Sequence, residues 1–439
     1  MNRSLSIKLL ALALSVSVLT AACSSGGSET ASPSDAASPA AVEETEAAEP
    51  TEEAAEEEPT EEEAAAAMPT VDTPASNLTR DLSYLLVEHE YLAGTAVLTA
   101  VQAGGDLEDP TFTSAAGTLD KNSKALAGAI EGVYGKPAGK QFLDLWRAHI
   151  GFFVDYTLGK ATDDAAMTKK ASKDLDGYRS DFGAFIEGAT EGELPAKAVE
   201  DALNPHVKST KKAIDSVVAS DGKGFENLRL ASVHMPQIAT ALSGGIVAQQ
   251  GLEGEADSGA AALQRDLTYL LVEHEYLAGI AVYMAVGAGG DLEDPGFTSA
   301  AAALDENSKS LAGAVESVYG KAGGKQFLDL WRAHIGFFVD YTLGKATDDA
   351  KMTKKASKDL DGYRSDFGAF LEGATEGGLP KKAVEDALLP HVDSTKKAID
   401  SVVAGSGKAF DDLRLAAVHM PGIATAIAGA IVTQFPDKF

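Results

Sequence analysis

The chain has 439 residues, with 37 Lys and Arg against 66 Asp and Glu, and a formal net charge of −29 at pH 7. It contains a single cysteine, so no disulfide can form within it. Without the first 76 residues, 35 basic and 51 acidic residues remain, and no basic stripe runs through them. This balance argues against binding to nucleic acid or to an anionic lipid surface.

Residues 1–22 have the pattern of a secretory signal peptide. Two basic residues precede an apolar run from Leu9 to Leu19, which is too short to span a membrane. Cys23 follows, and the segment resembles a bacterial lipoprotein signal, which implies lipidation of Cys23, anchoring to the cell membrane and an extracytoplasmic location. Such signals prefer Leu or Val where this chain has Thr20, so ordinary cleavage that leaves a free thiol stays the alternative.

Residues 23–76 are predicted to be a disordered acidic linker. The segment is rich in Ser, Ala, Gly and Pro and then in Glu, and it carries 15 acidic residues without any Lys or Arg. It offers no large apolar side chains for a core, and its like charges repel one another. We expect a tether that holds the rest of the chain away from the membrane, with an acidic interaction tail as the alternative.

An internal repeat organises the remainder of the chain. The segment Asp81–Gly94 reappears as Asp266–Gly279, and Leu145–Tyr156 recurs unchanged as Leu330–Tyr341. Both pairs are separated by 185 positions, and no gap is needed between them. Such self-similarity is the signature of a duplicated structural unit.

The repeat predicts two helical domains, copy 1 (77–250) and copy 2 (263–439), joined by a Gly-, Ala- and acid-rich linker (251–262). Apolar residues recur at helical spacing, and no segment shows the alternation of a strand. The predicted helices of copy 1 span about 77–103, 111–134, 138–160, 163–189, 195–219 and 223–249. Because the connections are short, we expect an all-α fold of two tandem antiparallel bundles, each of about six helices.

Each copy carries four histidines, and each of the four falls on the apolar stripe of a different predicted helix. A buried imidazole without a partner costs about 1–3 kcal/mol, and neutral imidazole is a common ligand of transition metals. We therefore predict that the four inward histidines of each copy bind copper, zinc, iron or haem. The alternative is that they are core residues bonded separately to Tyr, Asp or backbone groups. The predicted ligands are His89, His149, His206 and His234 in copy 1 and His274, His334, His391 and His419 in copy 2.

Polar residues near these stripes are candidates to orient the ligating imidazoles, because a metal-bound histidine usually donates its other N–H to such a group. The candidates are Glu88, Asn122 and Tyr178 in copy 1 and Glu273, Asn307 and Tyr363 in copy 2. For Glu88 and Glu90, a solvated helix edge is the favoured interpretation.

Several familiar sites are excluded by their motifs. The chain has no Glu-x-x-His pair, no His-Glu-x-x-His zinc motif, no Cys-x-x-Cys-His haem attachment and no nucleophile elbow. Nothing names a substrate, so an enzyme is the less favoured interpretation.

The most characteristic strings are Leu-Leu-Val-Glu-His-Glu-Tyr-Leu-Ala-Gly, Trp-Arg-Ala-His-Ile-Gly-Phe-Phe-Val-Asp-Tyr, Pro-His-Val and Val-His-Met-Pro. Across residues 77–439 they resemble a family of secreted bacterial helical repeat domains, which sometimes occur beside segments labelled copper amine oxidase N-terminal-like. The resemblance implies the fold but no activity, and the copper label belongs to the neighbouring segment. Two hypotheses therefore stand: a tethered metal- or haem-binding module, and a structural or interaction module of the cell surface without a cofactor.

Overall fold

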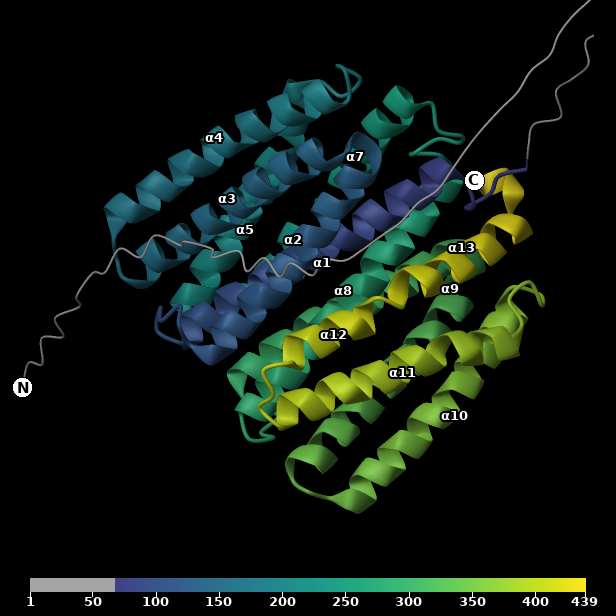
Figure 1. The fold of residues 1–439 in the computed structure, drawn as a ribbon. Coiled ribbons are helices and arrows are strands. Elements are labelled where there is room, and N and C mark those ends of the chain that lie inside the picture. Colours follow the sequence, from purple (N-terminus) through teal and green to yellow (C-terminus); the bar gives the residue numbers. More distant parts are fainter. Residues whose placement is uncertain (1–67) are drawn as a thin grey trace, which may run out of the picture. The chain divides into compact units, whose positions relative to one another are not determined.

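The computed structural model describes residues 68–439, which Figure 1 draws in colour. Copy 1 contains α1 (Pro74–Gln102), α2 (Pro110–Tyr134), α3 (Lys136–Ala161), α4 (Ala165–Ala189), α5 (Ala196–Ala219), α6 (Gly224–Ser232) and α7 (Met235–Gln250). Copy 2 contains α8 (Gly259–Gly287), α9 (Pro295–Ala346), α10 (Ala350–Ala374), α11 (Lys381–Val403), α12 (Ala409–Ala417), α13 (Met420–Gln434) and the short 3-10 helix η1 (Pro436–Lys438). The predicted all-α class is confirmed, since no strand occurs in residues 68–439. The predicted signal peptide, Cys23 and the linker up to residue 67 lie outside the described part.

Side-chain caps define where the helices begin. The Thr73 hydroxyl accepts a hydrogen bond from the backbone N–H of Ser76, and Pro74 occupies the first turn of α1. Asp109 caps α2 and Asp164 caps α4 in the same way. These caps satisfy backbone donors that have no partner inside the helix. The folded region therefore begins at Pro74, inside the segment that was predicted to be linker.

Consecutive helices of each copy pack against one another, and short turns connect them (Figure 1). Gly135 has a φ of 82° between α2 and α3, a conformation that glycine adopts without strain. Gly320 has a φ of 73° within α9, so α9 contains the predicted second and third helices of copy 2 on either side of this kink. The repeat is thus preserved, although one element spans two predicted helices.

The predicted helix 223–249 is wrong as a single element. It is divided into α6 and α7, and residues 233 and 234 lie between them. Pro236 explains the break, because proline lacks an N–H and its ring clashes with the carbonyl group four residues earlier. Copy 2 repeats the break between α12 and α13, ahead of Pro421. The histidine before each of these prolines therefore lies at a helix end.

The two copies belong to one compact unit, which includes all of residues 68–439. Helix α1 packs against α8, so each copy covers a face of the other's first helix. The predicted linker 251–262 is shorter than expected: residues 251–258 connect α7 to α8, and residues 259–262 form the first turn of α8. As a consequence, α1 has neighbours in both copies and exposes little of its middle to solvent.

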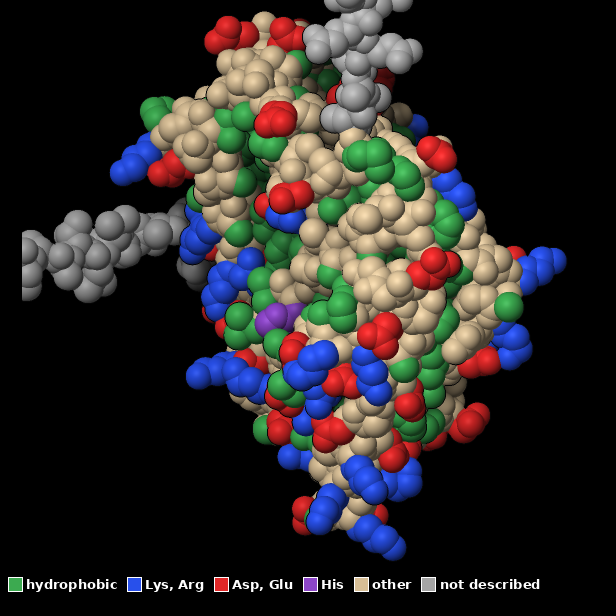
Figure 2. Space-filling view, turned by 90° about the vertical axis from the view of Figure 1, so that its right-hand side faces the viewer, with side chains coloured by type: hydrophobic (Ala, Val, Ile, Leu, Met, Phe, Trp, Pro, Cys, Tyr) green, Lys and Arg blue, Asp and Glu red, His purple; other side chains and the backbone are tan. Residues whose placement is uncertain are grey.

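Two stretches of the described chain are long and apolar enough to cross a membrane by length and composition, Gly259–Gly287 and Ala409–Gln434. In the structure, 56% and 44% of their most apolar windows are buried among other helices. The first of them also buries Glu273, His274 and Glu275. Packing within the bundle therefore accounts for their apolar character. On the face that Figure 2 shows, Lys and Arg alternate with Asp and Glu without a patch of one sign.

Candidate metal centre

A pair of buried imidazoles lies at the centre of each copy. Helix α1 supplies His89 and α3 supplies His149, and their Nε2 atoms are 3.3 Å apart. The equivalent atoms of His274 and His334 in copy 2 are also 3.3 Å apart. Each of these four side chains is only 2% exposed. The helical packing thus brings together residues that are 60 positions apart in the sequence.

Aromatic rings enclose this pair. The ring of Tyr178 stacks on His149 with centroids 4.7 Å apart, and Trp146 lies 4.8 Å from the ring of His89. Tyr178 was predicted to orient a histidine by hydrogen bonding, but its hydroxyl has no partner within the described chain, so it contacts His149 through the ring face. Tyr363 stacks on its histidine in the same way in copy 2.

Burial keeps these imidazoles neutral. It lowers the pKa of His89 to about 3, and nearby His206 adds to the effect. It lowers the pKa of His149 well below its ordinary value, with contributions from both other histidines, while the backbone carbonyls of Trp146 and Leu145 act in the opposite direction. At neutral pH each ring therefore keeps one nitrogen lone pair for a hydrogen bond or a metal ion.

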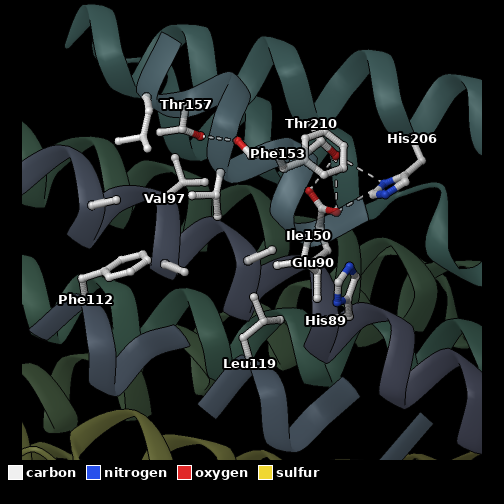
Figure 3. A pocket seen from close by; sticks show the side chains of 15 residues that line it. His89, Glu90, Val97, Phe112, Leu119, Ile150, Phe153, Thr157, His206 and Thr210 are labelled. Carbon is white, nitrogen blue, oxygen red and sulfur yellow. Dashed lines mark hydrogen bonds and ion pairs between the residues drawn. The ribbon is translucent and has the colours of Figure 1, made fainter. Parts of the chain in front are cut away.

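A second polar cluster lies beside the pair (Figure 3). His206 Nδ1 is 3.3 Å from Glu90 Oε2, and the Thr210 hydroxyl donates to Glu90 Oε1 at 3.2 Å. Burial raises the pKa of Glu90 to about 8 and lowers the pKa of His206 to about 4. The two groups therefore meet without charge at pH 7, and the Thr210 hydroxyl contacts both of them. His391, Glu275 and Thr395 form the same cluster in copy 2.

Small cavities connect these groups. In copy 2, a cavity of about 40 Å³ is lined by His274, His334, His391 and Met420, with aliphatic and aromatic side chains around them. In copy 1, a cavity of about 30 Å³ is lined by His89 and the Glu90 cluster (Figure 3). Such volumes accept a water molecule or a single ion. Haem does not fit in them, since pockets for ligands of that size measure about 300–1,000 Å³.

His234 and His419 do not lie with the imidazole pairs, contrary to the sequence prediction, although each is near enough to contribute to the lowered pKa of His206 or His391. Each lies at the break between two helices and is half-exposed, because the break turns the chain away from the predicted inward stripe. Figure 2 shows a histidine side chain at the surface of the molecule. Across residues 68–439, no group of three or more His, Cys, Asp or Glu side chains is already arranged around an ion position. Three of the four predicted ligands of each copy therefore lie in one region, and two of these three face each other directly.

Glu88 and Asn122 do not orient the histidines either. Glu88 is fully buried, and its Oε1 accepts from Tyr84 at 2.9 Å and from Tyr276 of copy 2 at 3.0 Å. Its Oε2 accepts from Asn122 and from Arg414 of copy 2, both at 2.9 Å. The favoured interpretation of Glu88 and Glu90 as a solvated edge is therefore wrong. Helix α8 covers the face of α1 that carries Glu88, while α5 supplies the partners of Glu90.

The same network occurs a second time with the copies exchanged. Glu273 accepts from Tyr91 of copy 1 at 2.8 Å, from Arg229 of copy 1 at 3.0 Å and from Asn307 at 2.8 Å. The rings of Tyr91 and Tyr276 stack with centroids 5.9 Å apart. Contacts that recur with the partners exchanged are typical of a two-fold interface between like subunits. These partners were not predicted from the sequence, although a helix without a continuous polar face is a signal that α1 is covered on several sides.

No protein family model, curated protein or solved structure matches the chain. The resemblance to secreted helical repeat domains therefore stays a prediction, and the function has to be argued from the geometry of the two imidazole pairs.

Proposed function

We propose that each copy binds one transition-metal ion between its facing imidazoles, His89 with His149 and His274 with His334. The observation that carries the proposal is the 3.3 Å separation between the Nε2 atoms of each pair. Two nitrogen ligands of a tetrahedral ion, each with a bond of about 2.0–2.1 Å, lie roughly 3.3–3.4 Å apart. The pair is therefore spaced as two ligands of one ion would be.

The metal-free state of this pair is poorly satisfied. Two neutral imidazoles can share one N–H···N bond, and the accepting ring must then carry its own proton on Nδ1. The Nδ1 atoms of His89 and His274 have no hydrogen-bond partner among the described residues, while those of His149 and His334 have near them only backbone carbonyls of their own helices, in poor hydrogen-bond geometry. A buried donor without a partner costs about 1–3 kcal/mol. Unsatisfied polar groups of this kind are rare in folded proteins and often accompany a ligand.

We further propose that the chain carries these sites outside the cell, tethered through a lipid on Cys23. The support is the apolar run that ends at the single cysteine and the acidic segment that follows it. Replacing Cys23 with alanine is expected to move the protein from the membrane fraction to the soluble fraction. An unchanged membrane fraction would show that the lipid on Cys23 is not the anchor.

The metal proposal is tested by elemental analysis of purified protein after loading with zinc or copper and removal of unbound ions. We expect two ions per chain in the wild-type protein and none after combined replacement of His149 and His334 by alanine. Combined replacement of His234 and His419 is the matched control, because these half-exposed histidines lie outside the imidazole pairs. Equal loss in both variants, or no bound ion in the wild-type protein, contradicts the proposal.

A structural module without a cofactor is the second candidate. It is favoured by the networks around Glu88 and Glu273, which are fully paired between the copies and need no ligand. This candidate predicts the same melting temperature with metal and with chelator. The metal-binding candidate predicts a higher melting temperature with metal, because an ion that binds only the folded state stabilises it.

A further inference from the structure

We infer that the ion held at these sites is copper(I), and that Met235 in copy 1 and Met420 in copy 2 supply a thioether ligand. This inference rests on the proposed function and adds the identity of the metal. It depends on which donor atoms line the cavity beside the imidazole pair and on how the chain places them there.

The donor set around the cavity is soft. In copy 2, His274, His334, His391 and Met420 line the same space, and the carboxyl group of Glu275 lines a separate cavity on the other side of His274 and His391. Met235 is placed in copy 1 by its equivalence to Met420 in the repeat. Thioether ligands select copper(I), imidazole suits copper as well as zinc, and carboxylate or water ligands suit magnesium, calcium and manganese. The remaining lining is aliphatic and aromatic, including Trp331. Such a lining offers no hydrogen-bond partners to the several water ligands that hard ions keep.

The helix break is what brings methionine into this position. In one continuous helix, His419 would lie on the buried apolar face. Instead α12 ends at Ala417, and a new helix, α13, begins at Met420, immediately before Pro421. His419 becomes half-exposed, while Met420 is only 2% exposed. Copy 1 has the same His-Met-Pro sequence, and Met235 is 1% exposed. Both copies thus replace an expected inward imidazole with a buried thioether.

The charge of the surroundings also favours a singly charged ion. The electrostatic free energy of transferring an ion from water into a protein core rises with the square of its charge. For a divalent ion it is therefore about four times that for a monovalent ion of the same size. Each imidazole pair has one carboxyl group beside it, Glu90 in copy 1 and Glu275 in copy 2, and one oxygen of each lies 3.3 Å from a histidine Nδ1. Burial of the site therefore disfavours a divalent ion relative to a monovalent one.

The test uses the full chain under anaerobic, reducing conditions. Copper(I) is titrated against bathocuproine disulfonate, zinc(II) is titrated in parallel, and X-ray absorption of the copper-loaded protein reports its ligands. We expect two copper(I) ions per chain, a sulfur atom in the copper coordination shell, and zinc affinity at least ten-fold weaker. The absorption measurement needs only the wild-type chain, so it does not depend on how any variant folds.

Combined Met235→Leu and Met420→Leu is expected to remove the sulfur signal and weaken copper(I) binding at least ten-fold. The matched control is combined Met167→Leu and Met352→Leu, which changes the equivalent methionines of α4 and α10 away from the site. Zinc bound as tightly as copper(I), or a copper shell without sulfur, overturns the inference and leaves the metal-binding function standing. Failure of the wild-type protein to bind either ion overturns both.

Discussion

Replacing Arg414 with methionine removes the cation from one of the two networks that join the copies. Arg414 Nε lies 2.9 Å from Glu88 Oε2, and the side chains are 24% and 0% exposed. Methionine preserves much of the aliphatic length of arginine but cannot donate a hydrogen bond. The substitution therefore leaves the Glu88 carboxylate buried without its cation while most of the packing is retained.

The expected loss in the free energy of unfolding is about 3 kcal/mol. Removing one partner of a buried ion pair costs about 3–5 kcal/mol, because the remaining charge is left uncompensated. The lower end applies here for two reasons. Arg414 is partly exposed, and Glu88 keeps hydrogen bonds from Tyr84, Tyr276 and Asn122.

Urea denaturation of the two proteins measures this loss. The control is Arg147→Met, which breaks an exposed pair with Asp120 whose side chains are 44% and 33% exposed. Exposed pairs contribute about 0–1 kcal/mol, so the control is expected to change stability by less than about 1 kcal/mol. If Arg414→Met costs no more than Arg147→Met, the reasoning about the buried carboxylate is refuted.

The remaining predictions concern pH and packing. Because the pKa of His89 is about 3 when folded and 6.5 ordinarily, only the unfolded chain gains its proton between these values, and unfolding free energy falls as pH falls through that range. Burial raises the pKa of Glu90 from 4.5 to about 8, so its contribution to the free energy of unfolding is lost as pH rises between those values. Glu90→Gln should therefore reduce the fall of the urea midpoint over this pH range, and an unchanged fall would contradict the assignment. Gly94→Ala places a Cβ 2.6 Å from the Leu228 side chain and is expected to destabilise by about 1–3 kcal/mol, whereas Gly117→Ala meets open space and should stabilise by up to about 1 kcal/mol. Equal melting temperatures for the two alanine variants would show that the α1–α6 contact is loose.

Local sequence signals predicted the helices well. Glycines, prolines and apolar periodicity act within a few residues, so they place helix ends such as Tyr134 and Ala189 from sequence alone. A break near Pro236 could be suspected in the same way, because proline is disfavoured in a helix interior, although Pro205 and Pro390 lie inside α5 and α11 without ending them. Giving that proline more weight than the apolar stripe would have removed His234 from the predicted ligands and shown Met235 at a helix start.

Side chains on α1 could not be assigned in this way. Periodicity assumes one buried face and one solvated face, and on that assumption Glu88 and Glu90 belong at the edge. In the structure, α5 contributes Thr210 and His206 beside Glu90, while copy 2 contributes Tyr276 and other donors to Glu88. A glutamate surrounded by donors has the same local sequence as one surrounded by water.

The sequence by itself determined that residues 77–439 are a duplicated, all-helical unit and that His89, His149 and His206 lie on buried helix faces. Repetition and helical periodicity can be read position by position, because they reflect interactions along a single helix. Only the tertiary structure decided which histidines meet, that a buried methionine rather than the fourth histidine points inward, and that each copy supplies partners to the other's buried carboxylate. Those outcomes depend on contacts between residues 60 to 326 positions apart, and they are set by how whole helices pack.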